Sequence, residues 1–221
     1  MIKAVIYDLD DLMVNSNPLH FEASSQVFEK YKVDLGKLPS SVRSGFIGMR
    51  VKDILKEIVR YFNLKIDFEK LHQERSELLL KLVREKLKMM PGLVNSLKRI
   101  KGGGLKIALA SSGAWWYINL VLEKFKVADY FDVIVSGDDV KRGKPDPETY
   151  LIAVKKLGIR PSQAVVLEDA TNGIAAAKAA GCFCIAIKNP YTPKQDLSRA
   201  DLALDSLADL SLKHLQSIST H

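Results

Sequence analysis

Short runs of apolar residues recur along the chain, and their spacing indicates the fold class. The runs lie at Lys3–Tyr7, Leu105–Ala110, Asp132–Val135, Ala164–Leu167 and Phe183–Ile187. From Leu105 onward, segments with helical spacing separate these runs, and the clearest of them is Asn172–Ala180, which Gly181 can terminate. This alternation predicts βαβ units, and therefore an α/β protein whose doubly wound parallel sheet is covered by helices on both faces.

The stretch between Tyr7 and Leu105 is too long for an ordinary crossover and contains no convincing strand. Apolar residues recur there at helical spacing in three segments, Pro18–Tyr31, Arg50–Phe62 and Asp67–Leu87. We therefore predict two domains, an α/β core of residues 1–15 and 89–221 and an inserted α-helical cap of residues 16–88.

Polar residues follow the predicted strands at the points where the strands end. They are Asp8 and Asp10 after the first strand, Ser111 and Ser112 after the second, Lys144 beyond the third, and Glu168 and Asp169 at the fourth. Ligands bind outside the carboxyl ends of open parallel sheets, so we expect these side chains to form one site. Clustered carboxylates repel each other unless a cation compensates them, and Mg²⁺ prefers oxygen ligands together with phosphate. The sequence therefore predicts a magnesium site that binds a phosphorylated substrate.

The spacing of the first two acidic residues also predicts a reaction. Asp8 and Asp10 are two residues apart on an extended backbone, which places both side chains on the same side. One carboxylate can attack phosphorus while the other protonates the leaving oxygen and then activates water. Ser111 and backbone N–H groups could hold the phosphoryl oxygens, and Lys144 could neutralise charge in the transition state. Ser111 could instead only cap the following helix.

Four ordered segments resemble the motifs of the haloacid-dehalogenase (HAD) superfamily. They are Asp8-Leu9-Asp10, Ser111 after a strand, Gly143-Lys144-Pro145-Asp146-Pro147, and Glu168-Asp169-Ala170-Thr171-Asn172-Gly173. The cap, whose first helix opens with Pro18-Leu19-His20-Phe21, is similar to that of the branch containing β-phosphoglucomutase and sugar-phosphate phosphatases. The resemblance implies a Rossmann-like core and an aspartyl-phosphate mechanism.

The resemblance also implies a role for each matching residue. The roles are Asp8 as nucleophile and metal ligand, Asp10 as acid/base with its backbone carbonyl on Mg²⁺, Ser111 and Lys144 on phosphate, Asp169 as metal ligand, and Glu168 as a further ligand, directly or through water.

Substrate-binding candidates come from the cap and from the second strand end. They are His20, Arg50 and Arg75 in the cap, and Ser112 in the core. A lid that closes over an anionic substrate needs cationic groups, and Gly48-Met49-Arg50 resembles a Gly-x-Arg element of sugar-phosphate phosphatases. The alternative for each cap residue is an ordinary surface charge or helix-end group.

Two residues depart from the pattern of this branch. Asp11 stands where Gly is usual, and Asn15 stands where Asp is common. We expect Asp11 to add negative charge beside the phosphate and to hinder a second anionic phosphate. This argument favours hydrolysis over isomerisation.

Composition restricts the class of partner. A chain of 221 residues with 47% apolar residues can bury one core and a modest inserted domain. The net charge of +7 arises from Lys and Arg interleaved with Asp and Glu, which indicates attraction for anionic substrates and no nucleic-acid partner. No apolar run approaches the roughly 20 residues of a membrane span, and Asp8 comes too early for a secretory signal. We predict a cytoplasmic monomer with no membrane partner.

The two cysteines, Cys182 and Cys184, are expected to be reduced thiols whose side chains point to opposite faces of a strand.

Four functions are compared on these residues. A phosphatase of a small phosphorylated metabolite, such as a sugar or polyol phosphate, is the main hypothesis, and a β-phosphoglucomutase-type phosphomutase is the alternative. Both use the same core residues, and only water exclusion and cap contacts separate them. A phospho-receiver signalling domain is disfavoured because its phosphorylated Asp follows a third strand and it has no long cap. A catalytically inactive binding protein is disfavoured because all four motifs keep their reactive groups.

Overall fold

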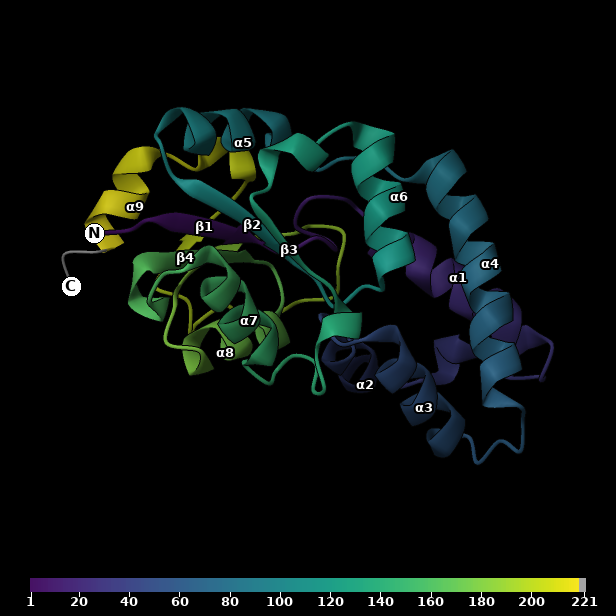
Figure 1. The fold of residues 1–221 in the computed structure, drawn as a ribbon. Coiled ribbons are helices and arrows are strands. Elements are labelled where there is room, and N and C mark those ends of the chain that lie inside the picture. Colours follow the sequence, from purple (N-terminus) through teal and green to yellow (C-terminus); the bar gives the residue numbers. More distant parts are fainter. Residues whose placement is uncertain (219–221) are drawn as a thin grey trace.

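The computed structural model describes residues 1–218 of the chain and shows an α/β fold, in which helices cover both faces of a parallel β-sheet (Figure 1). Six strands of these residues pair in the order β3-β2-β1-β4-β5-β6, and every pairing is parallel. The strands are β1 (Ala4–Tyr7), β2 (Lys106–Ala110), β3 (Val133–Val135), β4 (Ala164–Glu168), β5 (Phe183–Ile187) and β6 (Leu202–Leu204). The predicted α/β fold class is confirmed.

The helices lie between the strands and in a long segment after β1. They are α1 (Asn17–Glu29), α2 (Ser40–Gly45), α3 (Val51–Tyr61), α4 (Phe68–Lys86), α5 (Leu93–Gly102), α6 (Trp115–Phe125), α7 (Glu148–Leu157), α8 (Thr171–Ala179) and α9 (Leu212–Ile218). The three helices predicted after the first strand correspond to α1, α3 and α4, and the helix predicted at Asn172–Ala180 corresponds to α8.

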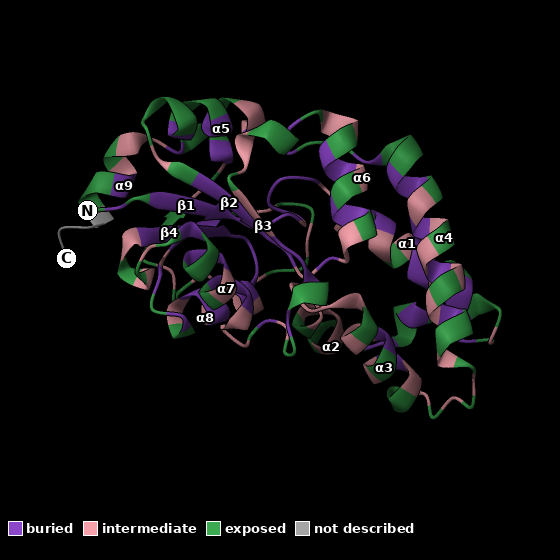
Figure 2. Ribbon diagram, in the orientation of Figure 1, coloured by how far each residue is buried: buried purple, intermediate pink, exposed green. Residues whose placement is uncertain are grey.

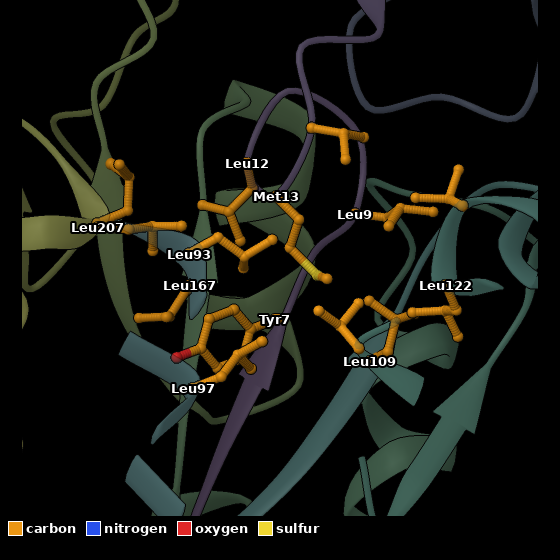
Figure 3. Packing of buried hydrophobic residues seen from close by; sticks show 14 of the residues in the cluster. Tyr7, Leu9, Leu12, Met13, Leu93, Leu97, Leu109, Leu122, Leu167 and Leu207 are labelled. Atoms are coloured by element: carbon orange, nitrogen blue, oxygen red, sulfur yellow. The ribbon is translucent and has the colours of Figure 1, made fainter. Parts of the chain in front are cut away.

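The central strands are buried because both faces of the sheet are covered. Successive residues of β1 alternate between two apolar cores, with Val5 and Tyr7 in one and Ala4 and Ile6 in the other. The first core lies on the side of α5 and α6, where Leu93 and Leu97 of α5 lie beside Tyr7 and Leu122 of α6 lies beside Leu109 (Figure 3). The second lies under α7 and α8. This two-sided burial explains why the strands read as continuous apolar runs.

Helices α1 to α4 extend away from one end of the sheet (Figure 1). They share an apolar core of their own, which includes Val27, Phe28, Leu55, Ile58 and Leu71. Buried stretches alternate with exposed ones along α1 and α4 (Figure 2). The cores are not fully separate, since other residues of α1 and α4 pack into the sheet core on the α6 side. The division at residues 16 and 88 stays a prediction.

Cys182 and Cys184 are buried free thiols. Both lie in the core cluster under α7 and α8, so the expectation that they point to opposite faces is wrong. The reason is that residues two apart on an extended chain share one face.

Within residues 1–218, no helix combines the length and the apolar character that a membrane crossing requires.

Candidate active site

The site is built where β1, β2 and β4 end, because the hydrogen bonding of the sheet continues into the residues that follow. The Asp8 N–H donates to the Leu167 carbonyl at 3.1 Å, and the Ser111 N–H donates to the Val135 carbonyl at 3.0 Å. The first bond holds Asp8 beside the end of β4, whose last residue is Glu168, and the second holds Ser111 beside the end of β3. The structure thus brings together the strand-end residues that the sequence indicated.

Lys144 lies at the centre of the acidic cluster. Its Nζ donates to Asp8 Oδ1 at 2.5 Å and to Glu168 Oε1 at 2.6 Å, and its side chain is fully buried. It also donates to the Ala110 carbonyl at 3.3 Å and lies 4.8 Å from the ring centroid of Tyr150. These contacts fix the ammonium against the Asp8 carboxylate, and an exposed loop position for Lys144 is excluded.

Glu168 uses both of its oxygens inside the protein. Oε1 accepts from Lys144 and from the Tyr150 hydroxyl, while Oε2 accepts from the N–H groups of Asp169 and Ala170. A Cβ at Gly173 would overlap the Glu168 carboxyl group, so only glycine leaves room for it. The main contact of the Glu168 carboxylate is therefore with the Lys144 ammonium.

The cluster fits a divalent cation on two observations. Carboxylate oxygens of Asp8, Glu168 and Asp169 lie within 4.8 Å of one another, and Asp169 Oδ2 is buried with no hydrogen-bond partner. Three ionised carboxylates against one ammonium leave an excess of two negative charges, which a divalent ion would balance. The Asp10 side chain is not part of this group of three, so only its backbone carbonyl remains as the ligand that the sequence interpretation assigned.

Burial and neighbouring charge shift the pKa values in the cluster. Burial raises the pKa of Asp8 well above its ordinary value, and Glu168 and Asp10 act in the same direction against the lowering effect of Lys144. Burial and the charge of Glu168 likewise raise the pKa of Asp169. Burial opposes the charge on Lys144, but Asp8 and Glu168 outweigh it and raise the pKa of the ammonium. A positive ion at the oxygens of Asp8 and Asp169 would favour their ionised forms.

Asp10 faces a different set of partners. Its Oδ1 accepts from Ser16 Oγ and from the Tyr117 hydroxyl, each at 2.6 Å, and lies 3.5 Å from His20 Nε2. Burial alone would raise the pKa of Asp10, but the His20 N–H that faces it, followed by the Ser16 and Tyr117 hydroxyls, holds it below its ordinary value. The side chain remains 27% exposed, so a substrate can still reach it.

Sequence reasoning missed Ser16, Tyr117 and Tyr150 at this site. Ser16 precedes Pro18 at a helix start and could have been taken as a cap, but its hydroxyl binds Asp10 instead. Tyr150 follows the Lys144 loop within one helical turn of Pro147, which is a weak signal. Nothing in the sequence indicated a role for Tyr117 in the site, because an aromatic residue among apolar residues of a helix is usually part of the core.

The two serines after β2 have different partners. Ser111 Oγ accepts from the Gly113 N–H at 2.9 Å, and its hydroxyl hydrogen remains available to a ligand. Ser112 Oγ donates to the Gly48 carbonyl at 2.8 Å and so connects the sheet edge to the segment between α2 and α3. Asn172 connects the same segment to α8, since its Nδ2 donates to the carbonyls of Gly45 and Ile47.

The cationic candidates of the helical segment are held by protein groups. The Arg50 side chain donates to Asp53 at 2.7 Å and to the Val140 carbonyl at 3.1 Å, next to the loop that carries Lys144. Arg75 is 3% exposed and donates to His20 Nδ1 at 2.6 Å. Since Nδ1 accepts, the hydrogen of the neutral imidazole lies on Nε2, which faces Asp10.

Asp11 has hydrogen-bond partners that the sequence did not indicate. Its carboxylate is buried and accepts from the N–H groups of Ser16 and Asn17, where it caps α1. Its φ of 64° is in the left-handed region, which explains why Gly is usual at this position. Burial, followed by the charge of Asp10, raises the pKa of Asp11 to about 7, and the hydrogen bonds from the N–H groups of Asn17 and Ser16 oppose this. The carboxylate is engaged with the start of α1, but its negative charge still acts in the direction that raises the pKa of Asp169, so the hindrance of a second phosphate stays a prediction.

Comparison with known proteins identifies the class. The family model of the haloacid dehalogenase-like hydrolases matches residues 5–187, and the chain belongs to this family. It is 34% identical over 185 residues to the phosphorylated carbohydrates phosphatase of Thermotoga maritima, which covers 81% of this chain and 82% of that protein. The family and its phosphatase relatives identify the chain as a HAD-type phosphatase.

Two solved structures share the complete fold. CbbY from Rhodobacter sphaeroides in complex with phosphate is 29% identical with a TM-score of 0.86, covering 98% of this chain and 100% of that one. β-Phosphoglucomutase from Clostridium difficile is 26% identical with a TM-score of 0.86, covering 100% of this chain and 98% of that one. The resemblance to the branch of sugar-phosphate phosphatases and β-phosphoglucomutase is confirmed.

Proposed function

We propose that this enzyme is a Mg²⁺-dependent phosphatase that transfers the phosphoryl group of a small sugar or polyol phosphate to Asp8 and then to water. The observation that carries the proposal is the buried Asp8 carboxylate, which lies 2.5 Å from Lys144 and beside Glu168 and Asp169. A carboxylate held there by an ammonium is oriented as a nucleophile and is shielded from bulk water. The similarity to a phosphatase of phosphorylated carbohydrates supports the substrate class.

The first half-reaction uses Asp8 and Asp10. The Asp8 carboxylate forms a bond to phosphorus as the bond from phosphorus to the ester oxygen breaks, and the Asp10 carboxyl group gives its proton to that oxygen. The alcohol leaves, Asp8 carries the phosphoryl group, and Asp10 is ionised. Lys144 and the Ser111 hydroxyl stabilise the charge that develops on the phosphoryl oxygens.

The second half-reaction restores both carboxylates. Asp10 accepts a proton from water as the water oxygen attacks phosphorus, and the bond between phosphorus and the Asp8 oxygen breaks. Inorganic phosphate leaves, Asp8 is again ionised, and Asp10 is again protonated. The lowered pKa of Asp10 favours its ionised state between the two steps, whereas the protonated state that begins the first step requires the negative charge of a bound phosphate ester, which raises the pKa of a neighbouring carboxyl group.

Asp8 and Asp169 are the side chains that we propose as magnesium ligands, with the backbone carbonyl of Asp10. The unpartnered Oδ2 of Asp169 supports this assignment, whereas Glu168 has both oxygens occupied and would contribute through water. A bound Mg²⁺ would neutralise charge on the phosphoryl group and on the clustered carboxylates.

Residues 16–88 are proposed as a cap that closes over the substrate. His20, Arg50, Arg75 and Ser112 remain our candidates for recognition, and the contacts of Ser112 and Arg50 across the boundary support a closing movement. Arg75 would act through His20, because its guanidinium is buried against the imidazole. The monomeric state and the cytoplasmic location stay predictions from the sequence.

A panel of sugar phosphates, polyol phosphates and nucleotides, assayed for phosphate release with Mg²⁺, tests the proposed function. We expect one class of sugar or polyol phosphate to be hydrolysed far faster than nucleotides. The absence of phosphate release from every member of the panel would contradict the proposal.

The similarity to a β-phosphoglucomutase structure makes isomerisation the second candidate. Incubation with β-glucose 1-phosphate and a trace of β-glucose 1,6-bisphosphate distinguishes the two. Hydrolysis predicts free phosphate, whereas rapid formation of glucose 6-phosphate with almost no phosphate would identify a mutase.

A further inference from the structure

Tyr117 lies on the first turn of α6, directly after the segment that begins with Ser111. Its ring is 2% exposed and packs edge to face against His20, with ring centroids 5.4 Å apart. Gly113 makes room for this ring, because a Cβ at that position would lie 2.9 Å from Tyr117 Cδ1. The Tyr117 hydroxyl then reaches Asp10 Oδ1 at 2.6 Å, although the two residues lie far apart in the sequence.

We propose that Tyr117 is a positioning residue for Asp10, holding the carboxyl group in the orientation that delivers its proton to the leaving oxygen. The inference rests on the proposed function, in which Asp10 is the acid and base. All contacts of the Asp10 side chain with donors of the described residues are made through Oδ1, namely those with Ser16, Tyr117 and His20. This arrangement leaves Oδ2 for the substrate.

The two oxygens of Asp10 therefore have separate tasks. An oxygen that accepts from two hydroxyl groups at 2.6 Å cannot carry a proton without losing one of these bonds, so the proton is carried by Oδ2. As the ester bond breaks, the Oδ2 proton moves to the leaving oxygen, and in the next step Oδ2 takes a proton from water. Tyr117 gives up no proton in either step. It restricts rotation of the carboxyl group from the core side, while Ser16 does so from the start of α1.

A series of leaving groups tests this role, since acid assistance matters most for alcohols that leave poorly. The probes are p-nitrophenyl phosphate, phenyl phosphate and glycerol 2-phosphate, assayed with Mg²⁺ by phosphate release. We expect Tyr117→Phe to lower kcat for glycerol 2-phosphate by about 10- to 100-fold, a part of the total effect of a general acid. The loss should be smaller for phenyl phosphate and nearly absent for p-nitrophenyl phosphate, with KM changed little. Equal losses on all three esters would overturn the proposal.

Tyr7→Phe is the matched control, because it removes another buried hydroxyl from the same core. Tyr7 donates to Ser96 Oγ at 3.1 Å, on the side of the sheet facing α5. We expect this variant to keep the wild-type ratio between the three substrates. The ratio is measured within one preparation, so a fraction of unfolded protein does not alter it. Tyr117→Leu provides a second variant without the hydroxyl, and it should show the same selective loss.

A double-mutant cycle with Asp10→Asn distinguishes this inference from the proposed function. With Asp10 replaced, Tyr117→Phe should no longer change the dependence on the leaving group, because the two residues act as one unit. An undiminished effect of Tyr117→Phe in that background would overturn the positioning role. A wild-type enzyme that hydrolyses none of the esters would instead contradict the proposed function.

Discussion

Replacing Gly173 with alanine tests whether the contact between Glu168 and Lys144 organises the site. Gly173 lies in the first turn of α8, and an added Cβ would overlap the Glu168 carboxyl group. Glu168 is 1% exposed, so its carboxyl group is enclosed by protein and cannot move out into solvent. Either its side chain must rotate away from Lys144 or α8 must shift from the sheet.

The magnitude follows from the bonds that Glu168 Oε1 would lose. It accepts from Lys144 at 2.6 Å and from the Tyr150 hydroxyl. Hydrogen bonds to charged groups contribute about 1.5–3 kcal/mol each, so losing both costs roughly 3–6 kcal/mol. Replacing Gly by Ala in a helix returns up to about 1 kcal/mol. We therefore expect Gly173→Ala to lower the free energy of unfolding by roughly 2–5 kcal/mol.

Urea denaturation followed by tryptophan fluorescence, together with kcat on p-nitrophenyl phosphate, measures both consequences. Gly102→Ala in α5 is the matched control, because its added Cβ would meet no atom within 4 Å outside its chain neighbours and its own helix backbone. The control should be as stable as the wild type or slightly more stable, with full activity. The reasoning fails if Gly173→Ala unfolds at the wild-type urea concentration and keeps full activity.

Three further predictions concern the metal, the helical segment and the thiols. Chelation should abolish turnover. Ca²⁺ should not restore turnover, because the larger and looser coordination shell of Ca²⁺ would misplace Asp8. Full activity after exhaustive chelation would remove the metal from the mechanism. Arg50→Ala and Arg75→Ala should lower kcat/KM for the best sugar phosphate more than for p-nitrophenyl phosphate, which offers a cap little to bind; equal losses would place both residues outside recognition. Cys182 and Cys184 should react with a thiol reagent only after unfolding, because both thiols are buried and burial raises their pKa values, that of Cys182 to about 12. Rapid labelling of the folded protein would contradict this expectation.

The core of the site could be predicted because strand order and residue type determine it. Asp8, Ser111 and Glu168 each follow a buried apolar run, and parallel strands bring such ends to one edge. Lys144 lies in a loop beyond β3, so its place at the site was indicated less directly, by its position after a strand and by its resemblance to a family motif.

Contacts between elements that are distant in the sequence could not be predicted in this way. The Tyr117 hydroxyl matters only because α6 packs beside the start of α1, and nothing in the α6 sequence indicates this. Arg75 was expected to face the substrate, but burial of α4 against α1 directs it to His20. Strand β6 was missed because it has only three residues, and Asp201 and Asp205 flank it.

The partners of Asp11 could not be predicted for a similar reason. Its charge was considered without a partner, whereas the positive φ turns its carboxylate toward the free N–H groups at the start of α1. An acidic residue beside a helix start can be compensated by backbone donors, which no pattern of side chains reveals.

The central claim is that Asp8 carries the phosphoryl group, and a rapid acid quench of a single turnover tests it most directly. Excess enzyme is mixed with the best sugar phosphate and Mg²⁺, quenched in acid, digested, and searched by mass spectrometry for a phosphorylated peptide, with borohydride reduction marking the acyl phosphate. The account predicts transient phosphate on Asp8, formed before free phosphate appears, and no phosphopeptide or turnover in Asp8→Asn. Product formation without any phosphoenzyme, or comparable turnover by Asp8→Asn, would contradict it.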